Sequence, residues 1–207
     1  VTNGGSLTAG FSVQFYATSV VTVDGGEITV NQLYQSEGGK LSIVNGGSVT
    51  LTNSYFGMGG EITVGGDDSG AVSTFESAAL VGAEAASLGG DYGEHEGETV
   101  LNILENGEAI FGSGLKVGHR ADASVSKDAT VNVEEGGRME VAKTLQIGSV
   151  GDAEAVGVVN VNGGELEAST ADVGLNERSS LNIDGGSFSA QSVTNNGAIN
   201  VTGEAVV

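Results

Sequence analysis

The segment VNVEEGGRMEV at residues 131–141 decides the fold. Val131 and Val133 alternate with polar residues before a Gly-Gly pair, and Met139 and Val141 alternate in the same way after it. A period of two is typical of β-strands, because successive side chains of a strand point to opposite faces. The segment therefore predicts two short strands joined by a glycine turn, each with one apolar face.

The same unit recurs along the chain. It appears as VTNGGSLTA (1–9), VTVDGGEITV (21–30), LSIVNGGSVTL (41–51), LNILENGEAIF (101–111), VNVNGGELEA (159–168), LNIDGGSFSA (181–190) and INVTGEAVV (199–207), with EITVGG (61–66) as a half unit. A second motif, an aliphatic residue before glycine, follows several units as ALVG (79–82), LKVG (115–118), LQIG (145–148) and ADVG (171–174). Each repeat thus carries three short strands with a period of roughly 20 residues, which is typical of solenoids.

Strands this short bury their apolar faces only by stacking. Coils stacked at about 4.8 Å form a parallel β-helix with aligned aliphatic side chains inside. An antiparallel sandwich is the alternative, but the constant order of the motifs favours the solenoid. We expect an all-β chain in which residues 1–207 form a single β-solenoid domain of about eight to nine three-strand coils. Both ends fall inside repeat units, which suggests a segment or subunit of a larger assembly.

Alternation assigns the side chains of the first strand to two faces. The inward positions are Val21, Val23, Leu41, Ile43, Leu101, Ile103, Val131, Val133, Val159, Val161, Leu181, Ile183, Ile199 and Val201. One outward position holds Asn102, Asn132, Asn160, Asn182 and Asn200. Amides stacked at the coil spacing can hydrogen-bond to one another, so we expect a structural ladder; an asparagine-lined binding face is the alternative.

The outward positions of the second strand are charged in the middle of the chain. Arg138 is expected beside Glu165 as an ion pair, and Glu140 beside Glu167 as a like-charge pair that a cation could relieve. Nearer the N-terminus, one outward position holds Thr8, Thr29 and Thr50, a hydroxyl array of the kind that could order water as in ice binding. The array covers three coils and then stops.

Composition and charge exclude several classes of function. The chain has 36 glycines and no proline, cysteine or tryptophan, so it has neither disulfides nor thiolate metal sites. Seven Lys and Arg against 27 Asp and Glu give a net charge of −20, which disfavours binding to nucleic acid and to anionic membranes. No apolar stretch approaches 18 residues, so we expect no membrane insertion.

Insertions after the aliphatic-glycine motif are expected to project from one edge of the solenoid. They occupy residues 83–99, 119–130, 149–158 and 175–180. The longest contains Glu84, Asp91, Glu94, Glu96 and Glu98, oxygen ligands of the kind that Ca²⁺ accepts, with His95 as a nitrogen ligand for a transition metal. We expect a solvated acidic loop and no cofactor, and a Ca²⁺ site at these carboxylates is the alternative.

No catalytic motif is recognisable. The chain has two histidines, no nucleophile elbow and no P-loop. Carboxylate pairs for polysaccharide cleavage can be drawn anywhere in so acidic a chain, so they carry no information. We expect a non-enzymatic protein, with a polysaccharide lyase or hydrolase as the rival and a Ca²⁺-dependent adhesion module as a further alternative.

The repeated pattern aliphatic-Asn-aliphatic-x-Gly-Gly, followed by an alternating strand and an LxVG-like segment, resembles the β-strand repeats of bacterial autotransporter passenger domains and related surface-anchored β-solenoid proteins. The resemblance covers most of the chain. It implies a right-handed parallel β-helix that is extracellular or on a bacterial cell surface, with an adhesive, matrix or shaft role. The implied partners are further copies of the chain, other surface proteins or glycans.

Overall fold

The structure is a computed structural model of the whole chain. It describes residues 1–16, 18–36, 38–58, 60–66, 71–75, 86–88, 99–118, 128–148, 156–174 and 178–207. Within these residues the secondary structure consists of β-strands and turns, and no helix is present that could cross a membrane.

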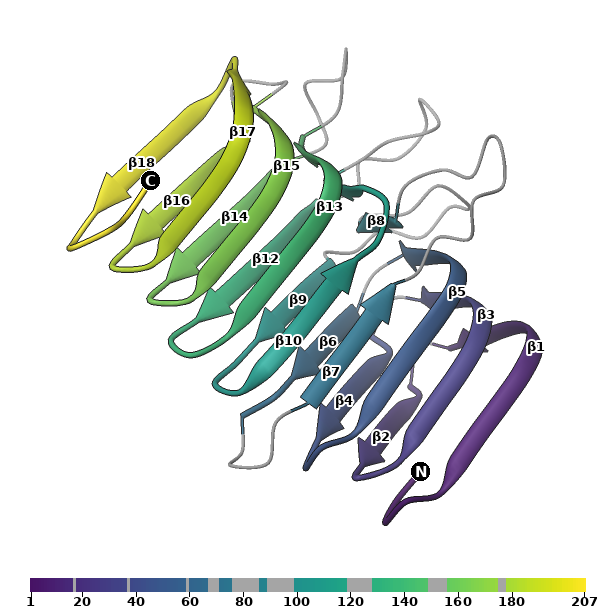
Figure 1. Ribbon diagram of the computed structural model, residues 1–207. Helices are drawn as coiled ribbons and strands as arrows, with labels where there is room; N and C mark the ends of the chain where they lie inside the picture. The colour runs from purple at the N-terminus through teal and green to yellow at the C-terminus, as the bar shows by residue number, and fades with distance from the viewer. Residues whose placement is uncertain are drawn as a thin grey trace.

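The strands form two sheets that lie face to face and run along the molecule (Figure 1). The eight-stranded sheet has the order β18-β16-β14-β12-β9-β6-β4-β2 and contains β2 (Val20–Asp24), β4 (Lys40–Val44), β6 (Gly60–Val64), β9 (Thr99–Ile103), β12 (Ala129–Glu134), β14 (Gly157–Asn162), β16 (Ser180–Asp184) and β18 (Ala198–Thr202). The ten-stranded sheet contains β1 (Ser6–Phe15), β3 (Glu27–Ser36), β5 (Ser48–Met58), β7 (Ala71–Phe75), β8 (Ala86–Leu88), β10 (Gly107–Phe111), β11 (Leu115–Val117), β13 (Arg138–Ile147), β15 (Glu165–Val173) and β17 (Ser187–Asn195).

Strands of successive repeats pair in parallel. Every pairing between the strands named above is parallel. The chain alternates between the two sheets, except that β7 and β8, and β10 and β11, follow each other within the ten-stranded sheet. The predicted all-β architecture of stacked parallel strands is thus confirmed. An antiparallel sandwich is excluded, because its neighbouring strands would run in opposite directions.

The core is a set of aliphatic columns between the two sheets. One column runs through the eight-stranded sheet in strict register, as Val23, Ile43, Val64, Ile103, Val133, Val161, Ile183 and Val201. All of them except Val201 are completely buried. Val201 is 49% exposed and Leu7 is 46% exposed. Both lie on strands with one neighbour in their sheet, so one side of each lacks a packing partner.

The sequence predicts separate second and third strands in each repeat, but the structure joins them in several repeats. In β13 and β15 the chain continues through this point as one strand. Ala142 and Lys143 stand opposite the single residue Ser169, where the register shifts. Such a bulge bends a strand while keeping it paired on both sides, so no break between strands is needed. The two strands are separate elements at β7 and β8 and again at β10 and β11.

The four predicted insertions end earlier than the sequence indicates. Thr99, Ala129, Gly157 and Ser180 already belong to strands of the eight-stranded sheet. Ala129 pairs in register with both Thr99 and Gly157. These residues are small or polar, so they carry no apolar alternation that would mark the strand. Most of the remaining residues of the insertions lie outside the described part of the chain.

The first residue of each glycine turn has a left-handed backbone. Gly46 and Gly136 have φ values of 73° and 74°. In the unit LNILENGEAIF the same place is taken by Asn106, with φ 59°. Glycine and asparagine tolerate this conformation because glycine has no Cβ and the short asparagine side chain bonds locally.

The second glycine is required for a different reason, which is the close approach of two coils. A Cβ at Gly107 would lie 2.2 Å from the carbonyl oxygen of Val64 in the preceding coil. A Cβ at Gly137 would lie 2.5 Å from the carbonyl oxygen of Ile103. The repeated Gly-Gly pair therefore combines one conformational and one steric requirement.

We expect Gly107→Ala to destabilise the protein by roughly 1–3 kcal/mol, because the added methyl group must push two backbones apart. The matched control is Gly10→Ala, since a Cβ at Gly10 meets no atom within 4 Å. Its expected effect is below about 0.5 kcal/mol. Urea unfolding followed by circular dichroism measures both, and equal effects of the two substitutions would contradict the steric explanation.

Candidate functional site

The outward face of the eight-stranded sheet carries a continuous ladder of asparagine amides. Asn132 Nδ2 donates to Asn102 Oδ1, and the same bond joins Asn160 to Asn132, Asn182 to Asn160 and Asn200 to Asn182. All four distances are 2.8 Å. The strands hold the five residues in register, so the amides stack at the strand spacing.

The ladder has a direction and a charged residue at one end. Each amide N–H points toward the N-terminal side, and Asn102 Nδ2 donates to Glu61 Oε1 at 3.1 Å. The other oxygen of Glu61 is 3.1 Å from Lys40 Nζ. The sequence predicted the asparagine column but missed Glu61. The only available signal was that Glu61 stands two residues before Thr63, the residue in register with Asn102.

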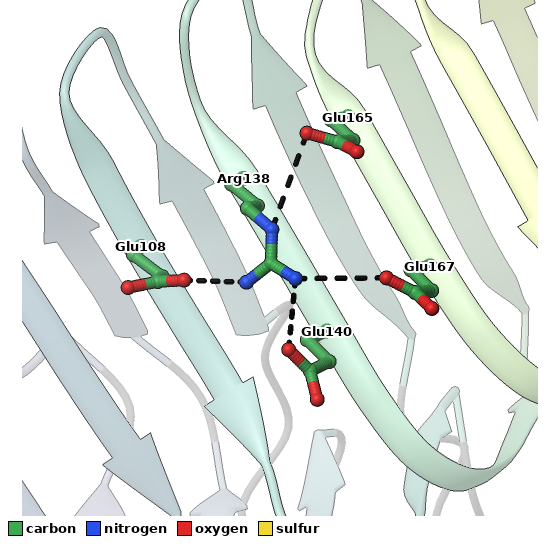
Figure 2. A network of polar contacts seen from close by, with 5 residues as sticks. All are labelled: Glu108, Arg138, Glu140, Glu165 and Glu167. Atoms are coloured by element: carbon green, nitrogen blue, oxygen red, sulfur yellow. Dashed lines mark hydrogen bonds and ion pairs between the residues drawn. The ribbon is translucent and has the colours of Figure 1, made fainter.

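A second network lies on the outward face of the ten-stranded sheet (Figure 2). The guanidinium of Arg138 bonds Glu108 through Nη1, and through Nη2 it bonds Glu140 at 2.9 Å. Nη2 is 3.5 Å from Glu167, and Nε is 4.0 Å from Glu165. One cation thus joins four carboxylates from three successive strands, β10, β13 and β15. We refer to these five residues as the Arg138 network.

The glutamates that contact Arg138 differ in part from those that the sequence predicted. The expected partner Glu165 is the most distant of the four, while Glu108 in the preceding coil is a hydrogen-bond partner. Glu108 occupies the same repeat position as Glu165, so its place was visible in the alignment. Glu140 and Glu167 stand opposite each other as expected. The cation that reaches both is the side chain of Arg138.

The guanidinium is held in its charged form. The hydrogen bond to Glu140 raises the pKa of Arg138 above its ordinary value. Partial burial opposes this effect, and the hydrogen bond to Glu108 adds to it. Arg138 is 34% exposed, so solvent screens each of these contacts. Its role is to compensate part of the negative charge where four carboxylates come together.

A shallow groove of about 480 Å³ follows the bend of β13, β15 and β17. Its polar lining residues are Glu140, Glu167, Ser169, Ser189 and Gln191. The volume falls in the range of small-ligand sites, but such sites are mostly enclosed and apolar. The carboxylates here are already engaged by Arg138, so the groove has the character of an open, acidic surface.

The predicted Ca²⁺ ligands Glu84, Asp91, Glu94, Glu96 and Glu98, together with His95, lie outside the residues that the structure describes. Among the described residues, no group of three His, Asp or Glu side chains is arranged to hold a metal ion. The Ca²⁺ site in the longest insertion therefore stays a prediction.

The threonine column extends one strand further than the sequence indicated. Thr8, Thr29 and Thr50 pair in register, and Thr50 pairs with Thr74 of β7. The next residue in the column is Ile110. Thr74 was missed because the repeat pattern departs after residue 66. The column ends where the acidic surface begins, so it does not continue into the Arg138 network.

Comparisons with models of protein families, with curated proteins and with solved structures give no match.

We expect Asn160→Ala to lower the free energy of unfolding by roughly 1–3 kcal/mol, because it removes two amide hydrogen bonds in a half-buried ladder. The matched control is Asn200→Ala, which removes one bond at an exposed position and is expected to cost about half as much. Both are measured by urea unfolding. If Asn160→Ala were neutral, the ladder would contribute nothing to stability.

Replacing Arg138 by Gln is expected to destabilise the protein by about 1 kcal/mol, because four carboxylates then repel one another without a cation. Added NaCl or CaCl₂ should recover part of the melting temperature, since cations screen this repulsion. Lys40→Gln is the control, because Lys40 forms a single exposed ion pair. If added salt does not recover the stability that the Arg138 variant loses, the loss is due to packing and not to charge.

Proposed function

We propose that this protein is a non-enzymatic, structural or adhesive β-solenoid of a bacterial cell surface or extracellular matrix. The observation that carries the proposal is the asparagine ladder. Its outward side chains bond to neighbouring coils over five successive strands, so they reinforce the stack along its length. A surface built in this way suits a shaft or scaffold that must resist unravelling.

The finer architecture belongs to the same proposal. We infer a right-handed parallel β-helix of about eight to nine coils, because connections between parallel strands of one sheet are right-handed in nearly all proteins. An extracellular or cell-surface location is supported by the resemblance of the repeats to autotransporter passenger domains. The single domain is proposed to act as a segment or subunit of a larger assembly.

The distribution of charge supports the choice of partner class. The carboxylates of the Arg138 network outnumber its single cation, and the chain as a whole carries a charge of −20. Such a surface repels nucleic acid and anionic lipid. The partners that we propose are further copies of the chain, other surface proteins or glycans, with contacts that lie away from the acidic surface.

The enzyme alternative is tested by incubating the purified protein with a panel of neutral and acidic polysaccharides. We expect no release of reducing ends or unsaturated products. Turnover of any substrate would overturn the non-enzymatic proposal. In that case the variants to assay are Glu140→Gln and Glu167→Gln, and Glu165→Gln is the control because Glu165 lies outside the groove. A loss of turnover in the first two variants and not in the control would show that the groove carboxylates are responsible.

Melting curves with and without CaCl₂ test the Ca²⁺-dependent alternative. That alternative requires a rise in melting temperature that disappears when Glu84, Asp91, Glu94, Glu96 and Glu98 are replaced by amides. An unchanged melting temperature in the parent protein would exclude it and leave the structural role.

A further inference from the structure

Charged and uncharged side chains are segregated along the outward face of the ten-stranded sheet. From β10 onward this face carries the Arg138 network, together with Lys116, Lys143 and Asp172. On β1, β3 and β5, at the N-terminal end of the sheet (Figure 1), Glu27 is the one charged residue among the outward residues that the structure describes. Apart from Gly10, the others are neutral polar or aromatic residues, which we call the neutral face: Ser6, Thr8, Phe11, Ser12, Gln14, Thr29, Asn31, Gln32, Tyr34, Ser48, Thr50 and Thr52.

Hydrogen bonds between neighbouring coils orient the polar groups of the neutral face. Ser12 Oγ donates to Gln32 Oε1 at 2.7 Å, and the Tyr34 hydroxyl donates to the same oxygen at 3.5 Å. Thr52 Oγ1 donates to Asn31 Oδ1 at 3.4 Å. Side chains that are oriented before binding lose less conformational entropy when a ligand arrives. The neutral face is therefore an ordered array of hydroxyl and amide groups.

Aromatic side chains gather at the same end of the chain. Six of the ten phenylalanine and tyrosine residues lie between positions 11 and 56. Phe11, at the bulge of β1, is 82% exposed, and Tyr16, directly after this strand, is 66% exposed. The corresponding bulge position of β13 holds Lys143, so the exposed ring is not a general feature of the repeat. Exposed rings offer a large apolar area that binding can remove from water.

We propose that the neutral face binds a neutral linear polysaccharide that lies along the solenoid axis across β1, β3 and β5. This inference rests on the adhesive role proposed above and names the partner and the surface. A neutral sugar presents C–H groups, which pack on aromatic rings, and hydroxyls, which donate and accept hydrogen bonds as serine, threonine and amide side chains do. The neutral face provides partners for both kinds of group.

Charge selects a neutral polymer over a charged one. The net charge of −20 repels an acidic polysaccharide. A basic polymer would be attracted to the carboxylates around Arg138, on the other half of the sheet. The neutral face lies away from that acidic surface, so a neutral chain can approach it without desolvating a cluster of charges.

The spacing of the strands suits an extended polymer. Equivalent positions recur about every 4.8 Å along the axis, and one sugar ring of an extended chain is close to this length. Thr8, Thr29 and Thr50 form one column with this spacing, and Gln14 and Tyr34 belong to another. Successive rings would therefore meet successive coils. We expect binding to strengthen with the length of an oligosaccharide until it spans the three strands, because each further contact is made within one complex.

The test is affinity electrophoresis of the full chain in gels that contain a soluble polysaccharide, compared with gels without polymer. Mixed-linkage β-glucan, galactomannan and dextran are the neutral probes, and polygalacturonate is the acidic probe. We expect retardation by at least one neutral probe and none by polygalacturonate. Added NaCl should leave the retardation unchanged, because no ion pair is involved.

Two variants and their controls connect the binding to the neutral face. Phe11→Ala and Tyr34→Ala each remove an aromatic ring and are expected to weaken binding by roughly fivefold. The controls are Lys143→Ala and Thr194→Ala, which change the same repeat positions in β13 and β17 and should leave binding unchanged. Phe11 is already exposed, so its substitution removes little packing, and circular dichroism checks that each variant is folded.

Three results would overturn the proposal: no retardation by any neutral probe, equal retardation by polygalacturonate, or unchanged binding in both aromatic variants. Loss of binding in NaCl would overturn it as well, since the contact would then depend on charge. Each of these results leaves the structural role standing. Release of products from a probe would instead overturn the non-enzymatic role, so the two failures can be told apart.

Discussion

The register of parallel strands is the constraint on which the rest of the structure depends. Backbone hydrogen bonds place each residue beside its counterpart in the next coil, so any repeat position becomes a column along the molecule. The column from Val23 to Ile183 fills the interior, and the column from Asn102 to Asn200 forms the ladder. The residue type at each repeat position therefore determines the composition of one column, either in the core or on the surface.

The same register explains the difference between the two outward faces. On the eight-stranded sheet, identical neutral residues satisfy one another at each step. On the ten-stranded sheet, glutamates come together at each step, and a single arginine must bridge three coils. The first arrangement can be extended without limit, whereas the second reaches only as far as the guanidinium of Arg138.

Features that repeat were predictable from the sequence, and features that occur once were not. The inward valines and isoleucines and the five asparagines stand at fixed repeat positions, so alignment alone located them. Glu108 stands at the same repeat position as Arg138 and Glu165, so alignment located it. Glu61 acts through the length of its side chain, which lets it reach the neighbouring column of asparagines. Repeat spacing contains no information on that reach. The bulge at Ala142 and Lys143 was missed for a related reason, because it changes the pairing of the backbone without interrupting the strand.

The asparagine ladder also gives the molecule an electrical direction. Four amide hydrogen bonds point the same way, so their dipoles add, as peptide dipoles do along an α-helix. The donor end meets the carboxylate of Glu61, much as an acidic residue stabilises the first turn of a helix. Two such columns lying side by side have the lower electrostatic energy when they run in opposite directions.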